Sequence, residues 1–180
     1  MTKLWQITPI WAGETVAILA AGPAMSVELA ESVKQYKTIA VNRAVRFALW
    51  ANMFVALDPL PEFWDPVVGF EGIKICGVDS EAVDAQYVGM LYETVQLAES
   101  HSIEIRNNAL AAMRLAERCG AAKMLLLGFD AQHYQALHVH TGFFGFIEGL
   151  AQMTAELQAK GIEVQFVQPL KTELKTLTKK

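Results

Sequence analysis

Cysteine is scarce in this sequence, with two residues among 180, and charged residues make up only 19% of it. Cys76 and Cys119 stand in apolar surroundings without the spacing of a disulfide framework or a zinc site. We therefore expect buried, reduced thiols and a cytoplasmic protein. A hydrophobic content of 53% excludes an intrinsically disordered chain. No linker or low-complexity segment interrupts residues 1–180, so one domain is expected.

The sequence also lacks a strong charge of either sign and a long uncharged apolar run. Its net charge of -4 gives no general attraction to nucleic acid or to anionic lipid, and we expect neither as a partner. The longest candidate for a membrane span, residues 39–57, contains two arginines and two asparagines, which makes it too polar to cross a bilayer. Residues 171–180 form a basic tail that we expect to be solvated.

Short apolar runs alternate with amphipathic segments along the chain. The runs that predict strands cover residues 16–21, 38–41, 53–57, 73–78, 103–105, 123–129 and 163–167. The segments that predict helices begin at Ala24 and cover residues 43–50, 79–101, 107–119 and 145–160. This alternation predicts an α/β fold with a three-layer, Rossmann-like, doubly wound and mostly parallel sheet, after an irregular lead-in at residues 1–14.

Three of the apolar runs end at a residue that an apolar core would reject. Gly22 follows the first run, Asn42 the second and Asp58 the third. The carboxyl ends of parallel strands share one edge of the sheet, and open α/β sheets bind ligands at that edge. We therefore expect these three residues, with Asp130 after the run at 123–129, to line a common cleft.

The turn of Gly22, Pro23, Ala24 and Met25 comes directly before the first expected helix. Glycine permits close approach of a ligand, and free amides of Ala24, Met25 and Ser26 would suit a phosphate; an ordinary strand-to-helix turn has the same composition. Two common nucleotide motifs are missing, namely GxGxxG after the first strand and GxxxxGK[ST]. The sequence therefore gives no support to a dinucleotide-dependent dehydrogenase or a Walker-type NTPase.

The polar side chains at the other strand ends each have two interpretations. The amide of Asn42 could contact a nucleotide or cap the following helix. The carboxylate of Asp58 could hold a ribose hydroxyl or Mg²⁺, or belong to a turn before Pro59. Asn107 and Asn108 open the helix with the strongest pattern, where Asn107 by itself would be a helix cap.

A polar loop after Asp130 contains His133, His138 and His140. A histidine there could be a general base. The HxH pair with the aspartate could bind a metal, but its spacing matches no established zinc pattern. A solvated loop is the third alternative. The aromatic residues that follow favour contact with the core or with another subunit, which leaves a homo-oligomer open: Phe143, Phe144 and Phe146.

Two blocks of the sequence resemble a group of phage and prophage proteins that carry a Gly-Pro-Ser-Leu loop. The first block reads GETVAILAAGPAM, then IAVNRAV and ALWANMFVALDP. The second reads NNALAAMRLAERCGAAKMLLLGFDAQ, followed by HVHTG. That group is similar to bacterial sialyltransferases with a cytidine monophosphate donor and, more distantly, to hydroxymethylpterin diphosphokinase-like proteins.

The resemblance implies a Rossmann-like sheet that holds a nucleotide at the Gly-Pro loop. By position, it implies that Gly22 and Pro23 contact the donor phosphate and that Asn42 contacts the nucleotide. It assigns the far side of the cleft to Asn107, Asn108, Gly128 and Asp130, and the base to His138 or His140. Ala24 replaces the serine of the group and Ala109 replaces a glycine, changes that affect catalysis more than binding.

Two functions follow as alternatives. The first is a phage-encoded, nucleotide-dependent transferase of the glycosyltransferase type, with a nucleotide or nucleotide-sugar donor. In it His138 or His140 deprotonates an acceptor hydroxyl, and no cofactor is required, although Mg²⁺ would be compatible. The second is a non-catalytic nucleotide-binding or assembly protein that retains the fold.

Overall fold

The computed structural model describes residues 3–4, 8–77, 85, 87–88, 93–98, 101–105, 107–130 and 146–168. Its main feature is a sheet in which all neighbouring strands are parallel, in the order β1-β6-β5-β4-β3-β2-β9-β10. The outer strands β1 (Lys3–Leu4) and β6 (Tyr87–Val88) have two residues each. Six longer strands form the body: β2 (Thr15–Leu19), β3 (Lys37–Val41), β4 (Met53–Ala56), β5 (Ile73–Cys76), β9 (Lys123–Leu127) and β10 (Glu163–Val167).

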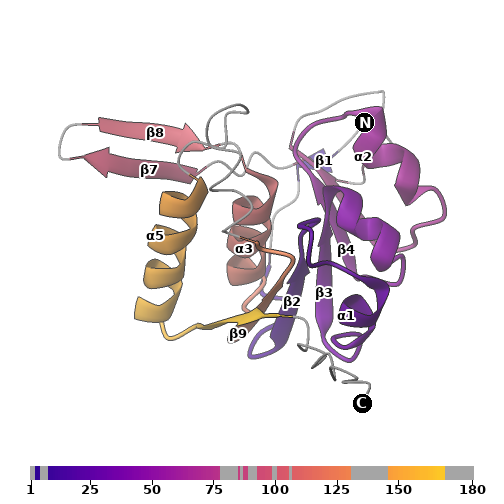
Figure 1. Ribbon diagram of the computed structural model, residues 1–180, viewed down its shortest axis with the longest axis horizontal. Coiled ribbons are helices and arrows are strands. Elements are labelled where there is room, and N and C mark those ends of the chain that lie inside the picture. Colours follow the sequence, from indigo (N-terminus) through magenta and orange to yellow (C-terminus); the bar gives the residue numbers. More distant parts are fainter. Residues whose placement is uncertain are drawn as a thin grey trace, which may run out of the picture.

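Helical segments cover both faces of this sheet (Figure 1). One face carries α1 (Val27–Glu31), the 3-10 helix η1 (Asn42–Phe47), α2 (Pro61–Trp64) and the 3-10 helix η2 (Asp65–Val67). The other face carries α3 (Asn108–Arg118) and α5 (Phe146–Ala159). Because helices cover both faces, the central strands are continuous apolar runs whose residues are almost all buried. The predicted three-layer, Rossmann-like α/β fold is thus confirmed.

A separate core fills the space on each side of the sheet. On the α1 side, the ring of Phe54 in β4 packs edge-on against Trp64 of α2, with ring centroids 5.0 Å apart. On the α3 side, Met113, Leu126 and Phe146 are at most 2% exposed. The expectation that Phe146 contacts the core is therefore confirmed.

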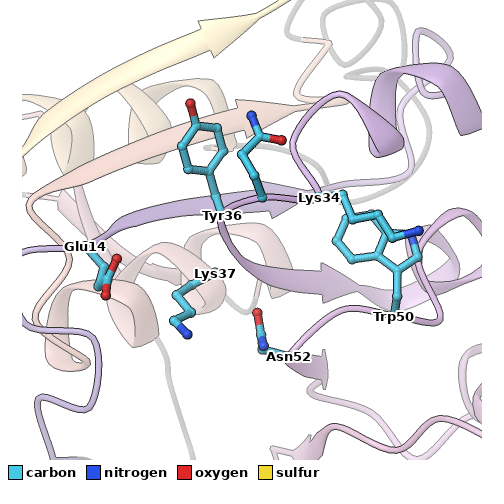
Figure 2. A pocket seen from close by; sticks show the side chains of 7 residues that line it. Glu14, Lys34, Tyr36, Lys37, Trp50 and Asn52 are labelled. Atoms are coloured by element: carbon cyan, nitrogen blue, oxygen red, sulfur yellow. The ribbon is translucent and has the colours of Figure 1, made fainter.

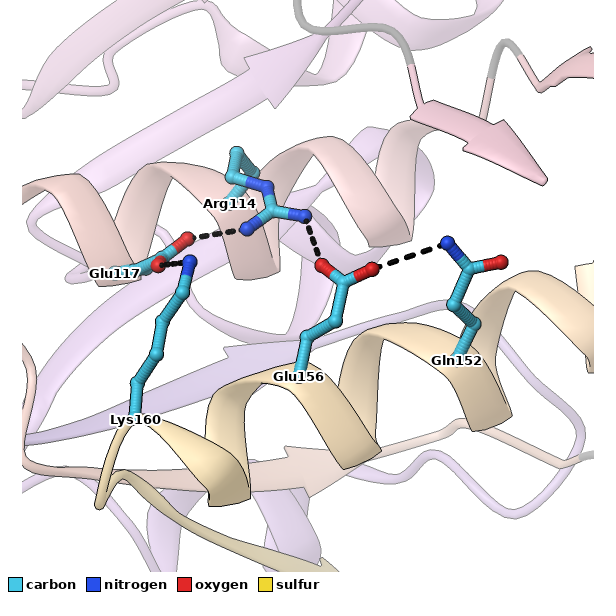
Figure 3. Close-up of polar contacts among 5 residues, drawn as sticks. All are labelled: Arg114, Glu117, Gln152, Glu156 and Lys160. Atoms are coloured by element: carbon cyan, nitrogen blue, oxygen red, sulfur yellow. Dashed lines mark hydrogen bonds and ion pairs between the residues drawn. The ribbon is translucent and has the colours of Figure 1, made fainter. Parts of the chain in front are cut away.

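A polar network joins α3 to α5 (Figure 3). Arg114 contacts Glu117 at 2.6 Å and Glu156 at 3.1 Å, so its guanidinium bridges the two helices. Lys160 reaches Glu117 from the end of α5 at 2.5 Å, and the amide of Gln152 donates to Glu156 at 3.0 Å. Partial burial raises the pKa of Glu117, but the hydrogen bonds and charges of Lys160 and Arg114 outweigh it and leave the pKa below its ordinary value.

The helix expected at residues 79–101 is wrong where the structure describes it. Strand β7 (Glu93–Ala98) pairs antiparallel with β8 (His101–Ile105), and Tyr87–Val88 joins the main sheet. The register pairs Val95 with Ile103 and Thr94 with Glu104, and it shifts between Gln96 and Ala98. Backbone pairing between the two strands overrides the helical spacing of the apolar positions in the sequence. The short strand expected at 103–105 is confirmed as part of β8.

Three smaller expectations about local structure also change. The first helix begins at Val27 and not at Ala24, because the hydroxyl of Ser26 accepts a hydrogen bond from the amide of Leu29 and caps it. The expected helix at 43–50 is the 3-10 helix η1, and the expected loop after Pro59 contains α2 and η2. Within the lead-in, Lys3–Leu4 forms β1.

Candidate functional site

The carboxyl edge of the sheet brings together the strand ends that the sequence singled out. Asp58 follows β4, Asn42 follows β3, Gly22 follows β2 and Asp130 follows β9. These four strands are consecutive in the sheet, and neighbouring strands are about 4.8 Å apart, so the row extends over roughly 14 Å. The winding reverses between β2 and β9, because β3 to β5 extend the sheet on one side and β9 and β10 on the other. In open α/β sheets this switch point is where ligands bind.

Two backbone hydrogen bonds join the segments that follow β2 and β9 at the switch point, and we call this pair of contacts the clasp. The amide of Gly22 donates to the carbonyl of Gly128 at 3.1 Å, and the amide of Ala20 donates to that of Leu127 at 2.8 Å. A Cβ on Gly22 would lie 3.0 Å from the carbonyl carbon of Gly128, and closer still to that carbonyl oxygen and to Oδ2 of Asp130. Glycine is therefore required here because protein atoms occupy the space where a side chain would be.

The amides of the Gly-Pro turn already have partners within the protein. The amide of Ala24 donates to Oδ2 of Asp130 at 2.9 Å, and the amide of Met25 donates to the carbonyl of Gly22 at 2.9 Å. The side chain of Met25 is buried in the core beneath α1, whereas Pro23 is exposed. The expectation that the amides of Ala24 and Met25 are free for a ligand is wrong, because a sequence does not reveal a carboxylate supplied from 106 residues away.

Asn42 has the most unusual environment of the edge residues. Its backbone is left-handed, with φ of 50°, a conformation that few residues other than glycine adopt. Its Oδ1 is buried and has no hydrogen-bond partner among the described residues. The alternative of a helix cap is wrong, because Val41 is the N-cap of η1 and no side-chain hydrogen bond caps that helix. The next residue, Arg43, forms an exposed ion pair with Glu62 at 3.0 Å.

The two asparagines at the start of α3 have structural roles. Oδ1 of Asn107 accepts hydrogen bonds from the amides of Ala109 and Leu110, so the helix-cap interpretation is confirmed. Oδ1 of Asn108 accepts from the amide of Leu57 at 2.5 Å and ties α3 to the end of β4. The carbonyl of the following residue, Asp58, accepts from the indole of Trp64 at 3.0 Å. The beginning of α3 thus lies at the same edge.

The predicted acid–base residues fall outside the described residues. His138 and His140, with His133, belong to the interval between Asp130 and Phe146, so their proposed role stays a prediction. In the described ranges, no group of three or more histidine, cysteine, aspartate or glutamate residues could hold a metal ion. Both cysteines are buried and neither forms a disulfide, and burial raises the pKa of Cys119 to about 11, which makes it a poor nucleophile.

A pocket of about 420 Å³ lies at the opposite, amino edge of the sheet (Figure 2). Lys37 begins β3 there, and Asn52 precedes β4 and accepts a hydrogen bond from the amide of Thr38 at 2.9 Å. The ammonium of Lys34 lies 5.4 Å from the ring centroid of Trp50. No pattern in the sequence predicts this pocket, because its residues come from three turns without a shared motif.

Comparisons with protein-family models, with curated proteins and with solved structures find no match to this chain. None of the helices in the described part of the chain has both the length and the apolar composition of a membrane span. The interpretation of the carboxyl edge therefore depends on its own residues and on the fold.

Proposed function

We propose that the carboxyl edge of the sheet binds a nucleotide and that the protein is a nucleotide-dependent transferase of the glycosyltransferase type. The observation that carries this proposal is the buried, unpartnered Oδ1 of Asn42, one strand away from the switch point between β2 and β9. A buried acceptor without a donor costs about 1–3 kcal/mol, and a ligand N–H or O–H would remove that cost. A base amino group or a ribose hydroxyl supplies such a donor.

The charges along the edge agree with a polar ligand that spans several strands. Asp58 and Asp130 are half-buried at the two ends of the row, where carboxylate oxygens accept hydrogen bonds from hydroxyl groups. The two carboxylates follow strands three positions apart, so they are too distant to share one Mg²⁺ ion. A single Mg²⁺ ion carried by a nucleotide is compatible with either. The histidines at 138 and 140 are the proposed bases that deprotonate an acceptor hydroxyl.

Substitution of Asn42 by glycine gives a selective test of nucleotide binding. Glycine adopts φ of 50° without strain, so Asn42→Gly removes both the strained conformation and the unpartnered oxygen. We expect the ligand-free variant to be at least as stable as the wild type, and to lose most of the stabilisation that a nucleotide gives. Thermal shift with cytidine, uridine and adenosine nucleotides, with and without Mg²⁺, measures both effects.

The matched control removes a side-chain amide from the other edge of the sheet. Gln35 is exposed near the amino-edge pocket, so Gln35→Ala should keep the full nucleotide-dependent shift. If no nucleotide stabilises the wild-type protein, or if Asn42→Gly keeps the whole shift, the proposal is wrong.

The observation that favours the second function is the closed state of the Gly-Pro turn. Asp130 and the carbonyl of Gly22 accept the hydrogen bonds of the Ala24 and Met25 amides, so these amides need no ligand. This is what we expect of a protein that keeps the fold and has lost the chemistry. A double substitution, His138→Ala with His140→Ala, separates the two functions. Loss of turnover with retained nucleotide binding supports the transferase, whereas unchanged biological activity supports a non-catalytic binding or assembly protein.

A further inference from the structure

The Gly-Pro turn at the switch point already holds an anion, which is the carboxylate of Asp130. Its Oδ2 accepts the hydrogen bond of the Ala24 amide at 2.9 Å and fills the space over Gly22 together with the carbonyl of Gly128. The other oxygen, Oδ1, has no hydrogen-bond partner among the described residues. The place where a phosphate would contact this turn is therefore occupied by a negative charge and by a carbonyl oxygen.

A second anion at this position would be unfavourable for two reasons. It would lie within a few ångströms of the Asp130 carboxylate, and it would find the amides of Ala24 and Met25 already engaged. Two unit charges about 5 Å apart repel each other enough, even at the dielectric constant of water, to lower affinity about fourfold. Partial burial of Asp130 increases that penalty.

One strand further along the edge, the residues are more favourable to a phosphate. Arg43 follows Asn42, and both members of its ion pair with Glu62 are about half exposed, at 50% and 52%. Ion pairs between exposed side chains contribute little to stability because water screens both charges, so Arg43 can exchange Glu62 for a ligand phosphate at little cost. A guanidinium also matches the geometry of phosphate oxygens.

From these observations we infer that Asp130 is a specificity-determining residue that excludes phosphate from the Gly-Pro turn and places the ligand phosphates beside Arg43, while Oδ1 of Asn42 accepts from a base or ribose donor. This inference rests on the proposed nucleotide-binding function. The turn then receives an uncharged part of the ligand whose hydroxyl donates to Oδ1 of Asp130. The ligand therefore lies in the opposite direction along the edge from the one that the sequence resemblance implies, in which Gly22 and Pro23 contact the phosphate.

Inorganic phosphate tests the exclusion without any assumption about the nucleotide. Asp130→Ala frees the Ala24 amide and removes the charge, whereas Asp130→Asn keeps an acceptor for that amide and removes only the charge. We expect phosphate to stabilise Asp130→Ala most, Asp130→Asn less and the wild type least. Asp65→Asn, an exposed site in η2, is the control for the same change in net charge, and it should behave as the wild type. Equal phosphate affinity in all four proteins would overturn the exclusion.

The orientation is tested by comparing cytidine with cytidine monophosphate by calorimetric titration. If the phosphate lies beside Arg43, Arg43→Gln lowers the affinity for the monophosphate about fourfold or more and leaves the affinity for cytidine unchanged. Asp130→Asn then does not raise the affinity for the monophosphate. The inference would be overturned by the reverse result, in which Asp130→Asn raises the affinity for the monophosphate about fourfold and Arg43→Gln leaves it unchanged. If neither compound nor the uridine and adenosine pairs bind to any of the proteins, the nucleotide-binding proposal fails, and the phosphate experiment still decides whether Asp130 excludes an anion.

Discussion

The clasp between the loops after β2 and β9 predicts that Gly128 tolerates no side chain. Gly128 has φ of +72°, and a Cβ on it would lie 2.9 Å from the carbonyl carbon of Ala20 and closer still to the carbonyl oxygen. The clashing atoms are backbone atoms at the end of the central strand β2, so rotation of a side chain cannot relieve the overlap. The variant Gly128→Ala must separate the loops and weaken the hydrogen bond from Gly22 to Gly128.

The magnitude is the sum of a conformational cost and a steric cost. A left-handed conformation costs about 1–2 kcal/mol for a residue with a Cβ. Insertion of an extra carbon into packed surroundings typically costs a further ~1–3 kcal/mol. Gly161 separates the two contributions, because it has φ of +82° and a Cβ on it would meet no other atom within 4 Å. We expect a loss of about 1–2 kcal/mol for Gly161→Ala and about 2–5 kcal/mol for Gly128→Ala.

Urea unfolding followed by circular dichroism, with linear extrapolation to water, measures both free energies of unfolding. Because small domains are stable by only about 5–15 kcal/mol, the difference between the two variants should be well resolved. If Gly128→Ala and Gly161→Ala are destabilised equally, the clasp is not rigid and the description of the switch point is wrong. A soluble but unfolded Gly128→Ala protein would agree with the upper end of the range.

Three further predictions concern the helices and the thiols. The lowered pKa of Glu117 contributes stability that is present above its ordinary value of 4.5 and is lost as the pH falls through the folded-state pKa. Glu117→Gln should therefore show a smaller decrease of the free energy of unfolding below pH 4.5 than the wild type. Parallel curves of unfolding free energy against pH for the two proteins would contradict this. Asn108→Ala removes the hydrogen bond that ties α3 to the end of β4 and should cost about 1–3 kcal/mol. Asn107→Ala removes only a helix cap and should cost about 1 kcal/mol in the same denaturation assay. Cys119, with its pKa raised to about 11, should not react with a disulfide reagent at pH 8 until denaturant is added, and rapid labelling of the native protein would show that it is accessible.

The fold was predictable from the sequence because its central strands are buried on both faces. Continuous apolar runs such as Val16–Leu19 have few alternatives to a covered parallel strand, and their separation by helical segments determines the layers. The same reasoning was wrong at residues 79–101, where apolar positions fit a helical period but Val95 pairs with Ile103 across a hairpin. Such pairing depends on a partner segment, which a local pattern does not contain.

The candidate site was predictable in its location and not in its details. Parallel strands place Gly22, Asn42 and Asp58 at one edge whatever their contacts, so topology alone was sufficient. The contact of Asp130 with Ala24 depends on the exact path of two loops, and the burial of the unpartnered oxygen of Asn42 depends on the left-handed backbone at that residue and on its neighbours in space. Composition and spacing contain neither kind of information.

The position of β2 in the sheet has a consequence for biosynthesis. Its neighbours are β3, which the ribosome makes soon afterwards, and β9, which follows more than a hundred residues later, since Val16 pairs with Met124. Until translation has passed Leu127, a nascent chain that has assembled β2 to β5 leaves the backbone edge of β2 without the partner strand β9. Because an unpaired strand edge can pair with a strand of another chain, the order of synthesis leaves this edge open to strand exchange until β9 has been made.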